Sequence, residues 1–249
     1  MMKKKMKIAL IGIGTLIALC LLIGVGFLYK FNSETKKMHP VATGKIVDNI
    51  YAIKDEFVNM YLMQDSNQYI AIDAGKDIEV VSAELKKLNI NPDRVIAVLL
   101  THTDVDHVAG VPLFKNAKIY ISKQEEMMLT GEKQKIPGVS NNLSRKDYIL
   151  LEDKQSLKIG NEASFSILTE GHTTGSMCYQ VNDKYLFTGD ILSLVDGKLG
   201  PSVKFFDLDH EMATKSISKI TKLPGVEYIF TAHFGYTNDY KDAVKDWKE

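Results

Sequence analysis

Near the N-terminus, residues 8–29 (IALIGIGTLIALCLLIGVGFLY) form a run of 22 residues without a charged side chain. At about 1.5 Å per residue, a helix of this length spans the roughly 30 Å hydrocarbon core of a bilayer. A cleaved signal peptide has a shorter apolar region, of about 7–15 residues, and a small-x-small cleavage site, which the following VGFLYKFN lacks. The run therefore predicts one uncleaved transmembrane helix, within a membrane anchor over residues 1–30.

Lysines flank this helix on both sides. Four precede it, at positions 3, 4, 5 and 7, and three follow it, at positions 30, 36 and 37. The positive-inside rule therefore slightly favours a cytoplasmic N-terminus. We expect a single-pass protein of the cell membrane whose later residues are extracytoplasmic. Residues 31–44 are polar and contain Pro40 and Gly44, which is typical of a juxtamembrane linker.

The remaining residues, 45–249, are expected to form one globular domain, because 45% hydrophobic and 25% charged residues suit a chain with a sizeable core. Basic and acidic residues are equal, at 31 each, so we expect no nucleic-acid partner. The two cysteines, Cys20 and Cys178, exclude a disulfide framework and a Cys-rich zinc module. Cys178 lies in a strand-like run and is expected to be a packed core thiol.

Short β-type runs alternate with helical segments after residue 45. Strands are predicted in IVDNIYAI, NMYLMQ, QYIAIDAG, VIAVLL, AKIYIS, EASFSILT, SMCYQVND, KYLFTGD and VEYIFTAH. Helices are predicted in KDIEVVSAELKKLNI, KQEEMMLT, DHEMATKSISKITKL and DYKDAVKDW. Strand runs early and late, each followed by helices, predict two packed sheets with helices outside, which is a layered α/β fold.

Polar residues follow the buried strand VIAVLL directly, in the stretch THTDVDHVAG at 101–110. This stretch holds four residues of metal-ligand type, His102, Asp104, Asp106 and His107. Taken alone, Asp and His after a strand are also consistent with capping of the next helix. Three other predicted strands end in the same way, with His172 in TEGHTTGS, Asp190 in YLFTGD and His233 in YIFTAHFG. Strand ends are where an α/β scaffold gathers site residues, so we expect these side chains to converge.

The order of these motifs resembles the metallo-β-lactamase superfamily, over roughly residues 45–240. The resemblance implies a four-layer αβ/βα sandwich with a dinuclear metal site at one edge of the sheets. The superfamily pattern is His-x-His-x-Asp-His, a His in Gly-His-Thr-x-Gly-Ser, an Asp in Thr-Gly-Asp and a last His. Carried over, it implies one metal ion on His102, Asp104 and His172, a second on Asp106, His107 and His233, and a bridging Asp190. Asp106 would also orient the attacking water.

Asp104 departs from the pattern, which has its second histidine there. A carboxylate makes the first site harder and more negative, and so lowers its preference for zinc over iron or manganese. The resemblance therefore implies two divalent ions, with zinc favoured and iron or manganese as alternatives. A carboxylate here also resembles the di-iron flavoproteins of the superfamily, which are redox enzymes. Those enzymes need a flavodoxin-like domain, and only a few residues follow the last predicted helix, so a hydrolase is favoured.

Two ions about 3.5–4 Å apart hold one water between them and lower its pKa to near 7. The resulting hydroxide attacks a carbonyl carbon or a phosphorus. The expected enzyme is therefore a metallo-hydrolase that cleaves an ester, lactone, thioester, amide or phosphodiester of a small molecule. A metal-binding module without catalysis remains an alternative, which metal content and turnover of generic esters would distinguish. A nuclease of the same superfamily is disfavoured by the neutral composition.

The sequence also predicts roles for residues outside the metal-ligand motifs. Two segments interrupt the strand-helix rhythm near the motifs and are expected to line a substrate pocket, residues 125–144 and 192–206. Thr173 and Ser176 are expected to order the His172 loop through hydrogen bonds. His39 and His210 lie outside the motifs and are expected to be solvated or capping residues.

Overall fold

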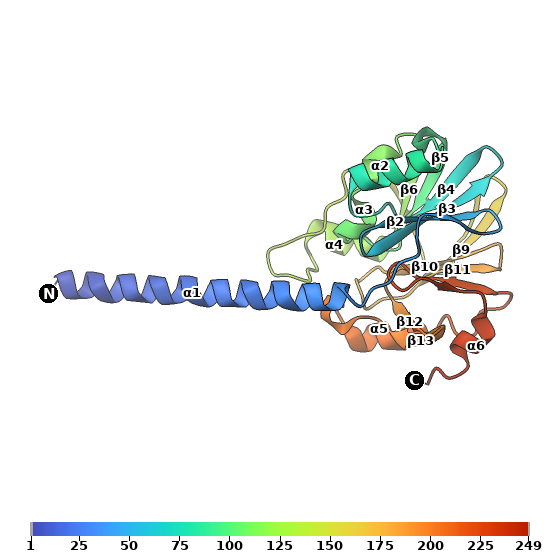
Figure 1. Cartoon of the computed structure of the whole chain (residues 1–249). Coiled ribbons are helices and arrows are strands. Elements are labelled where there is room, and N and C mark those ends of the chain that lie inside the picture. Colours follow the sequence, from blue (N-terminus) through green and yellow to red (C-terminus); the bar gives the residue numbers. More distant parts are fainter. Residues whose placement is uncertain (1, 249) are drawn as a thin grey trace. The chain divides into compact units, whose positions relative to one another are not determined.

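The computed structural model describes residues 2–248, which divide into two compact units after Lys37. Helix α1 (Met2–Thr35) makes up nearly all of the first unit (Figure 1). Within the described residues, one helical segment, Gly12–Thr35, is long and apolar enough to cross a membrane, with 24 residues and a mean hydropathy of 2.2. The linker predicted over residues 31–44 is shorter than expected, because α1 continues to Thr35 and the first strand begins at Gly44.

Seven strands of the second unit form one sheet in chain order. They are β1 (Gly44–Val47), β2 (Ile50–Asp55), β3 (Val58–Asp65), β4 (Gln68–Ile72), β5 (Val95–Leu99), β6 (Lys118–Ser122) and β7 (Tyr148–Leu151). The strands from β1 to β4 pair antiparallel, and those from β4 to β7 pair parallel. The parallel half places the carboxyl ends of β4 and β5 at one edge of the sheet.

Six further strands form a second sheet. Its order is β15 (Tyr236–Thr237), β14 (Tyr228–Phe230), β11 (Tyr185–Phe187), β10 (Met177–Val181), β9 (Glu162–Leu168) and β8 (Ser156–Ile159). Only β11 and β14 pair parallel, so the chain leaves this sheet after β9, β11 and β14 at the same edge. A separate hairpin is formed by β12 (Leu192–Val195) and β13 (Lys198–Pro201).

Helices cover the outer face of each sheet (Figure 1). On the first sheet lie α2 (Ile78–Lys87), α3 (Val105–Val108) and α4 (Glu126–Thr130), and on the second lie α5 (His210–Ile217) and α6 (Tyr240–Val244). Short 3₁₀ turns are η1 (Pro92–Arg94), η2 (Val111–Leu113), η3 (Lys123–Glu125) and η4 (Lys204–Phe206). Asp77 caps α2 by accepting from the backbone N–H groups of Glu79 and Val80.

Three hydrophobic clusters separate these layers. Tyr61, Tyr179 and Phe230 belong to the cluster between the two sheets. Leu85 of α2 packs on the outer face of the first sheet, and Ile217 of α5 packs on the outer face of the second. The order helix, sheet, sheet, helix is the four-layer αβ/βα sandwich that the motifs predicted.

Some predicted elements differ in their bounds. The run IVDNIYAI was predicted as one strand, but it forms two, because Asp48 adopts a φ of 43° and turns the chain between β1 and β2. The helix predicted over 209–223 ends at Ile217, and turns follow it. Strands β7, β8, β12, β13 and β15 were not predicted, because each has four residues or fewer, which is too short to show a clear period.

Candidate metal centre

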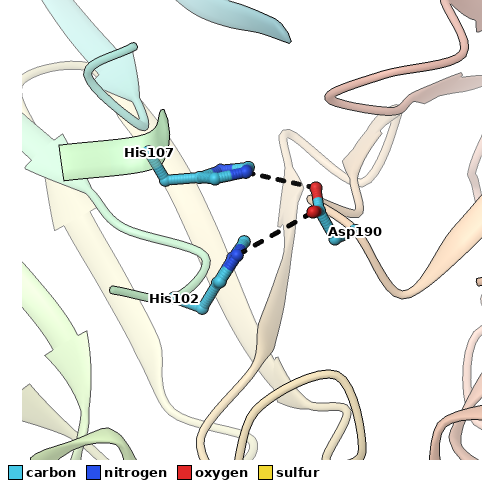
Figure 2. Close-up of side chains that lie close together, drawn as sticks. All are labelled: His102, His107 and Asp190. Carbon is cyan, nitrogen blue, oxygen red and sulfur yellow. Dashed lines mark ion pairs between the residues drawn. The ribbon is translucent and has the colours of Figure 1, made fainter. Parts of the chain in front are cut away.

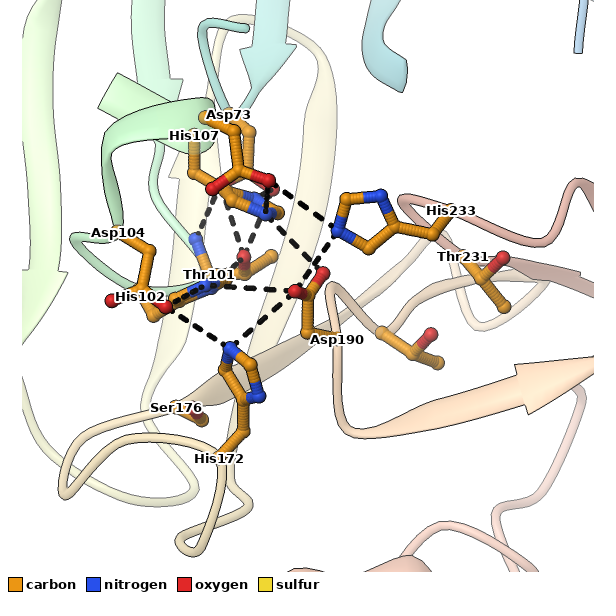
Figure 3. A network of polar contacts seen from close by, with 12 residues as sticks. Asp73, Thr101, His102, Asp104, His107, His172, Ser176, Asp190, Thr231 and His233 are labelled. Atoms are coloured by element: carbon orange, nitrogen blue, oxygen red, sulfur yellow. Dashed lines mark hydrogen bonds and ion pairs between the residues drawn. The ribbon is translucent and has the colours of Figure 1, made fainter. Parts of the chain in front are cut away.

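Four strand-end segments supply the site, and sheet topology explains why they meet. His102 to His107 follow β5 in the first sheet, whereas His172, Asp190 and His233 follow β9, β11 and β14 in the second. Phe187 of β11 lies in register with Phe230 of β14, so Asp190 and His233, each three residues further on, leave the same edge. Figure 3 shows the labelled histidines, Asp104 and Asp190 converging where the strand ends of the two sheets meet.

The structure brings all seven residues of the predicted motifs together. Their ligand atoms form three groups, each with atoms within 4.8 Å of one another: His102, Asp104 and His172; Asp106, His107 and His233; and His102, His107 and Asp190. The first two groups are the two sets implied by the resemblance. We call them the first set and the second set.

Asp190 lies between the two sets. Its Oδ1 is 3.2 Å from His107 Nε2, and its Oδ2 is 3.0 Å from His233 Nε2 and 3.4 Å from His172 Nε2. Figure 2 shows the carboxylate facing both His102 and His107. One carboxylate thus contacts histidines of both sets, which is the arrangement that a bridging ligand requires.

The four histidines of the site each have a polar partner at Nδ1, which for His102 is Thr101 Oγ1 at 3.0 Å. His107 Nδ1 is 2.8 Å from Asp73 Oδ2, His172 Nδ1 is 2.9 Å from Asp207 Oδ1, and His233 Nδ1 is 2.7 Å from the carbonyl oxygen of Phe57. These contacts direct the Nε2 atoms inward. A metal-ligating histidine almost always bonds a carboxylate or carbonyl in this way, because the bond fixes the ring and its tautomer.

Three inward-facing atoms fit a cation. His102 Nε2, His107 Nε2 and Asp190 Oδ1 are buried, and none has a hydrogen-bond partner within residues 2–248. An unsatisfied buried polar group costs about 1–3 kcal/mol, so three together are unusual in a native structure. Imidazole nitrogens and carboxylate oxygens are ligands of zinc and of related divalent ions. The residues present therefore fit divalent metal ions.

The charges of these groups also favour a cation. Burial and the neighbouring His107 lower the pKa of His102 to about 4, so its ring is neutral. Burial raises the pKa of Asp190, but His233, His107 and His172 outweigh it and hold that pKa well below the usual range. Burial and Lys135 lower the pKa of His172, whereas Asp190, Asp104 and Asp207 raise it, to about 9 overall. The three carboxylates therefore favour positive charge close to His172, whether a proton, an ammonium or a metal ion carries it.

Asp104 lies at the N-cap position of α3, yet its side chain makes no capping hydrogen bond. Its Oδ2 accepts from Lys135 Nζ and lies 3.2 Å from His172 Nε2 and 3.5 Å from His102 Nε2. Its Oδ1 accepts from Asn141 Nδ2 at 2.9 Å. The capping alternative is therefore wrong for Asp104, whose carboxylate faces the site.

Two supporting carboxylates were missed as site residues. Asp73 accepts from the backbone N–H of Thr101 at 2.7 Å as well as contacting His107, and it ends β4 beside β5. An Asp at the end of the neighbouring parallel strand was a signal that could have found it. Asp207 holds His172 and also bonds Ser202 Oγ and His210 Nδ1, both at 2.6 Å.

Glu125 is a third supporting carboxylate, fully buried between two site loops. Its Oε1 accepts from the backbone N–H and the hydroxyl of Thr103, both at 2.7 Å. Its Oε2 accepts from Thr173 Oγ1 at 2.6 Å and from the Gly175 N–H at 3.0 Å. One side chain thus joins the His102–Asp104 loop to the His172 loop. The predicted loop-ordering role of Thr173 and Ser176 is also seen, since the Thr173 N–H donates to Ser176 Oγ at 2.9 Å.

The remaining expectations have mixed outcomes. Cys178 is a core thiol, and burial raises its pKa to about 12. His210 was expected to be solvated or capping, but Asp209 is the N-cap of α5 and His210 bonds Asp207 instead. The backbone N–H of His39 donates to the carbonyl of His233 at 2.9 Å, so His39 adjoins the last motif. Both predicted pocket segments contact site residues, through Lys135 and Ser202.

Known proteins resemble the chain in sequence and in fold. A probable polyketide biosynthesis zinc-dependent hydrolase of Bacillus subtilis is 32% identical over 161 residues, covering 63% of this chain and 61% of the relative. A hydroxyacylglutathione hydrolase of Buchnera aphidicola is 30% identical over 179 residues, covering 69% and 60%. The matches thus span about three fifths of the length of these relatives.

A solved structure and a family model point the same way. The crystal structure of the BLEG-1 B3 metallo-β-lactamase aligns with a TM-score of 0.60 and 25% identity, covering 76% of this chain and 93% of that one. The family model of the metallo-β-lactamase superfamily matches residues 53–233, which include every motif residue. With the fold and the motifs in agreement, the chain belongs to the metallo-β-lactamase superfamily.

Proposed function

We propose that this protein is a metal-dependent hydrolase of a small molecule, with a dinuclear site on the first and second sets and on Asp190. The observation that carries the proposal is the group of buried atoms on His102, His107 and Asp190, which face one another without a hydrogen bond where residues from both sheets meet. When bound, divalent ions at such a site lower the pKa of water and polarise the bond to be cleaved. The relatives named as zinc-dependent hydrolases support zinc.

Asp106 is proposed to orient the attacking water and to accept its proton. Its Oδ2 lies 3.7 Å from His107 Nε2 and 3.5 Å from His233 Nε2, and its side chain is 17% exposed. The carboxylate therefore faces both the site and the solvent. Asp190 and Asp104 contribute negative charge that balances the bound cations.

The experiment uses the full chain in detergent micelles, stripped with a chelator and reloaded separately with zinc, manganese or iron. It is assayed on a panel of esters, lactones, thioesters, amides, β-lactams and phosphodiesters. We expect turnover of at least one class that appears on reloading and disappears with Asp106→Asn. Metal uptake without turnover of any class would instead indicate a metal-binding module without catalysis.

We further propose that α1 anchors the protein in the cell membrane and that residues 38–249 are extracytoplasmic. The length and apolar composition of Gly12–Thr35 support the anchor. The small excess of lysines before the apolar run supports the orientation.

A further inference from the structure

The ammonium of Lys135 lies among the ligand atoms of the first set. Lys135 Nζ donates to Asp104 Oδ2 and is 3.0 Å from His172 Nε2. Lys135 belongs to the irregular stretch between α4 and β7, 31 residues from Asp104 in the chain. Both side chains are largely buried, with 19% and 20% of their surfaces exposed. A positive charge of the protein itself thus contacts two of the three first-set ligands.

This ammonium and a metal ion need the same atoms. His172 Nδ1 donates to Asp207, so Nε2 is the ring atom that can bind Lys135 or a metal ion, and it binds either of them only through its one lone pair, in the deprotonated ring. That lone pair cannot accept a hydrogen bond from Lys135 and also ligate a metal ion. At Asp104, Lys135 takes Oδ2, and Asn141 already donates to Oδ1. Binding by Lys135 and metal binding at the first set are therefore mutually exclusive.

The second set has a different environment. Within residues 2–248, the ion pairs of Asp106 are with His107 and His233, and no lysine pairs with it. The two sets therefore differ in what a metal ion must displace. A metal ion that binds the first set must displace the ammonium of Lys135, whereas one that binds the second set displaces no lysine. The departure at Asp104 fits this difference, because a carboxylate forms an ion pair with an ammonium, whereas a neutral histidine only accepts a hydrogen bond from it.

We propose that Lys135 is a tethered competitor for the first metal site, so that the second set fills first and the first set fills only when Lys135 withdraws. The inference rests on the proposed metal site and adds an order and a difference in affinity. Withdrawal is sterically feasible, because residues 136–140 are exposed and the lysine stem is flexible. The apparent affinity of the first set for a metal ion is then its intrinsic affinity multiplied by the fraction of molecules in which Lys135 has withdrawn.

The test is equilibrium dialysis of the full chain in detergent against buffered free Zn²⁺, with bound zinc measured by elemental analysis. The parent should bind one zinc ion tightly and a second about tenfold or more weakly. Lys135→Met should tighten the second step by about tenfold or more and leave the first unchanged. Lys133→Met is the matched control, because it removes an exposed lysine of the same segment, and it should behave as the parent.

The outcomes separate this inference from the proposed function. Two equally tight zinc ions in the parent, or an unchanged second step in Lys135→Met, would overturn the role of Lys135 and leave the metal site standing. No bound zinc in any variant would overturn both. Lys135→Gln provides the same comparison if circular dichroism shows that Lys135→Met does not fold.

Discussion

At the scale of single residues, Asp104 joins the predicted ligands to a cation of the protein. Its carboxylate contacts His102, His172 and Lys135, so a substitution of Asp104 changes both the contacts among the site residues and the charge balance. The motif alone was enough to predict Asp104 as a site residue. It did not predict the partner Lys135, because residues in irregular segments have no periodicity that predicts where their side chains lie.

Changing Asp104 should alter which metal is bound. Asp104→His replaces a hard oxygen with a softer nitrogen, so the ratio of bound zinc to bound manganese or iron should rise. Asp104→Ala removes a ligand, so total bound metal should fall while the second set stays loaded. Both are measured by elemental analysis after dialysis against mixed metals. If both variants kept the parent's ratio and total, Asp104 would not be a ligand.

Glu125 should stabilise the fold through its four acceptor contacts. In Glu125→Gln, the amide NH₂ must face a backbone N–H of Thr103 or Gly175, which leaves a buried donor unpaired. We expect a loss of about 1–3 kcal/mol in the free energy of unfolding, measured by chemical denaturation. Exposed Glu132→Gln is the control and should change it by less than about 0.5 kcal/mol. Equal effects of the two changes would argue against the joining role of Glu125.

At the scale of elements, strand ends position the site, and this part was largely predictable. The runs before His102, His172, Asp190 and His233 are apolar enough to be recognised as strands, and β5, β9, β11 and β14 lie there. Asp207 was not predicted, because its place beside His172 depends on backbone hydrogen bonds between the His172 loop and the start of α5. The N–H groups of Leu208 and Asp209 donate to the carbonyls of His172 and Gly171, at 3.1 Å and 2.8 Å.

Gly171 allows the close approach of these two elements. It has a φ of 133°, and a Cβ there would overlap the backbone of Ala213 in α5. Gly171→Ala should therefore displace the His172 loop, lower the melting temperature and weaken zinc binding. Gly197→Ala is a matched control, because Gly197 has a φ of 78° and a Cβ there would meet only Thr237 Oγ1, at 3.9 Å, so this variant carries only the backbone strain of about 1–3 kcal/mol. Equal effects on zinc binding would show that close approach at Gly171 is unimportant.

At the scale of the whole molecule, the described residues divide into two compact units, and the sequence predicted an apolar helix followed by an α/β fold. The boundary between the units was less predictable, because residues 31–35, which are polar after Phe31, continue the helix beyond the apolar run. Helix formation extends past the last apolar residue when nothing in the sequence terminates it, and Pro40 is the first proline after the run.

The proposed topology predicts the behaviour of a tagged protein. The full chain should fractionate with membranes, because about 20 apolar residues suffice to span a bilayer. A C-terminal tag should be digested by protease added to intact spheroplasts. A version lacking residues 1–37 should appear in the soluble fraction. Protection of the tag in intact spheroplasts, with digestion after lysis, would reverse the orientation.

The most direct test of the metal site is bound zinc in the parent, His172→Ala and His233→Ala, at a free zinc concentration that saturates both sets. His172 belongs to the first set and His233 to the second. The parent should hold about two zinc ions per chain, and each variant about one. A parent without zinc, or two variants that keep the parent's zinc content, would contradict the assignment of these residues as metal ligands.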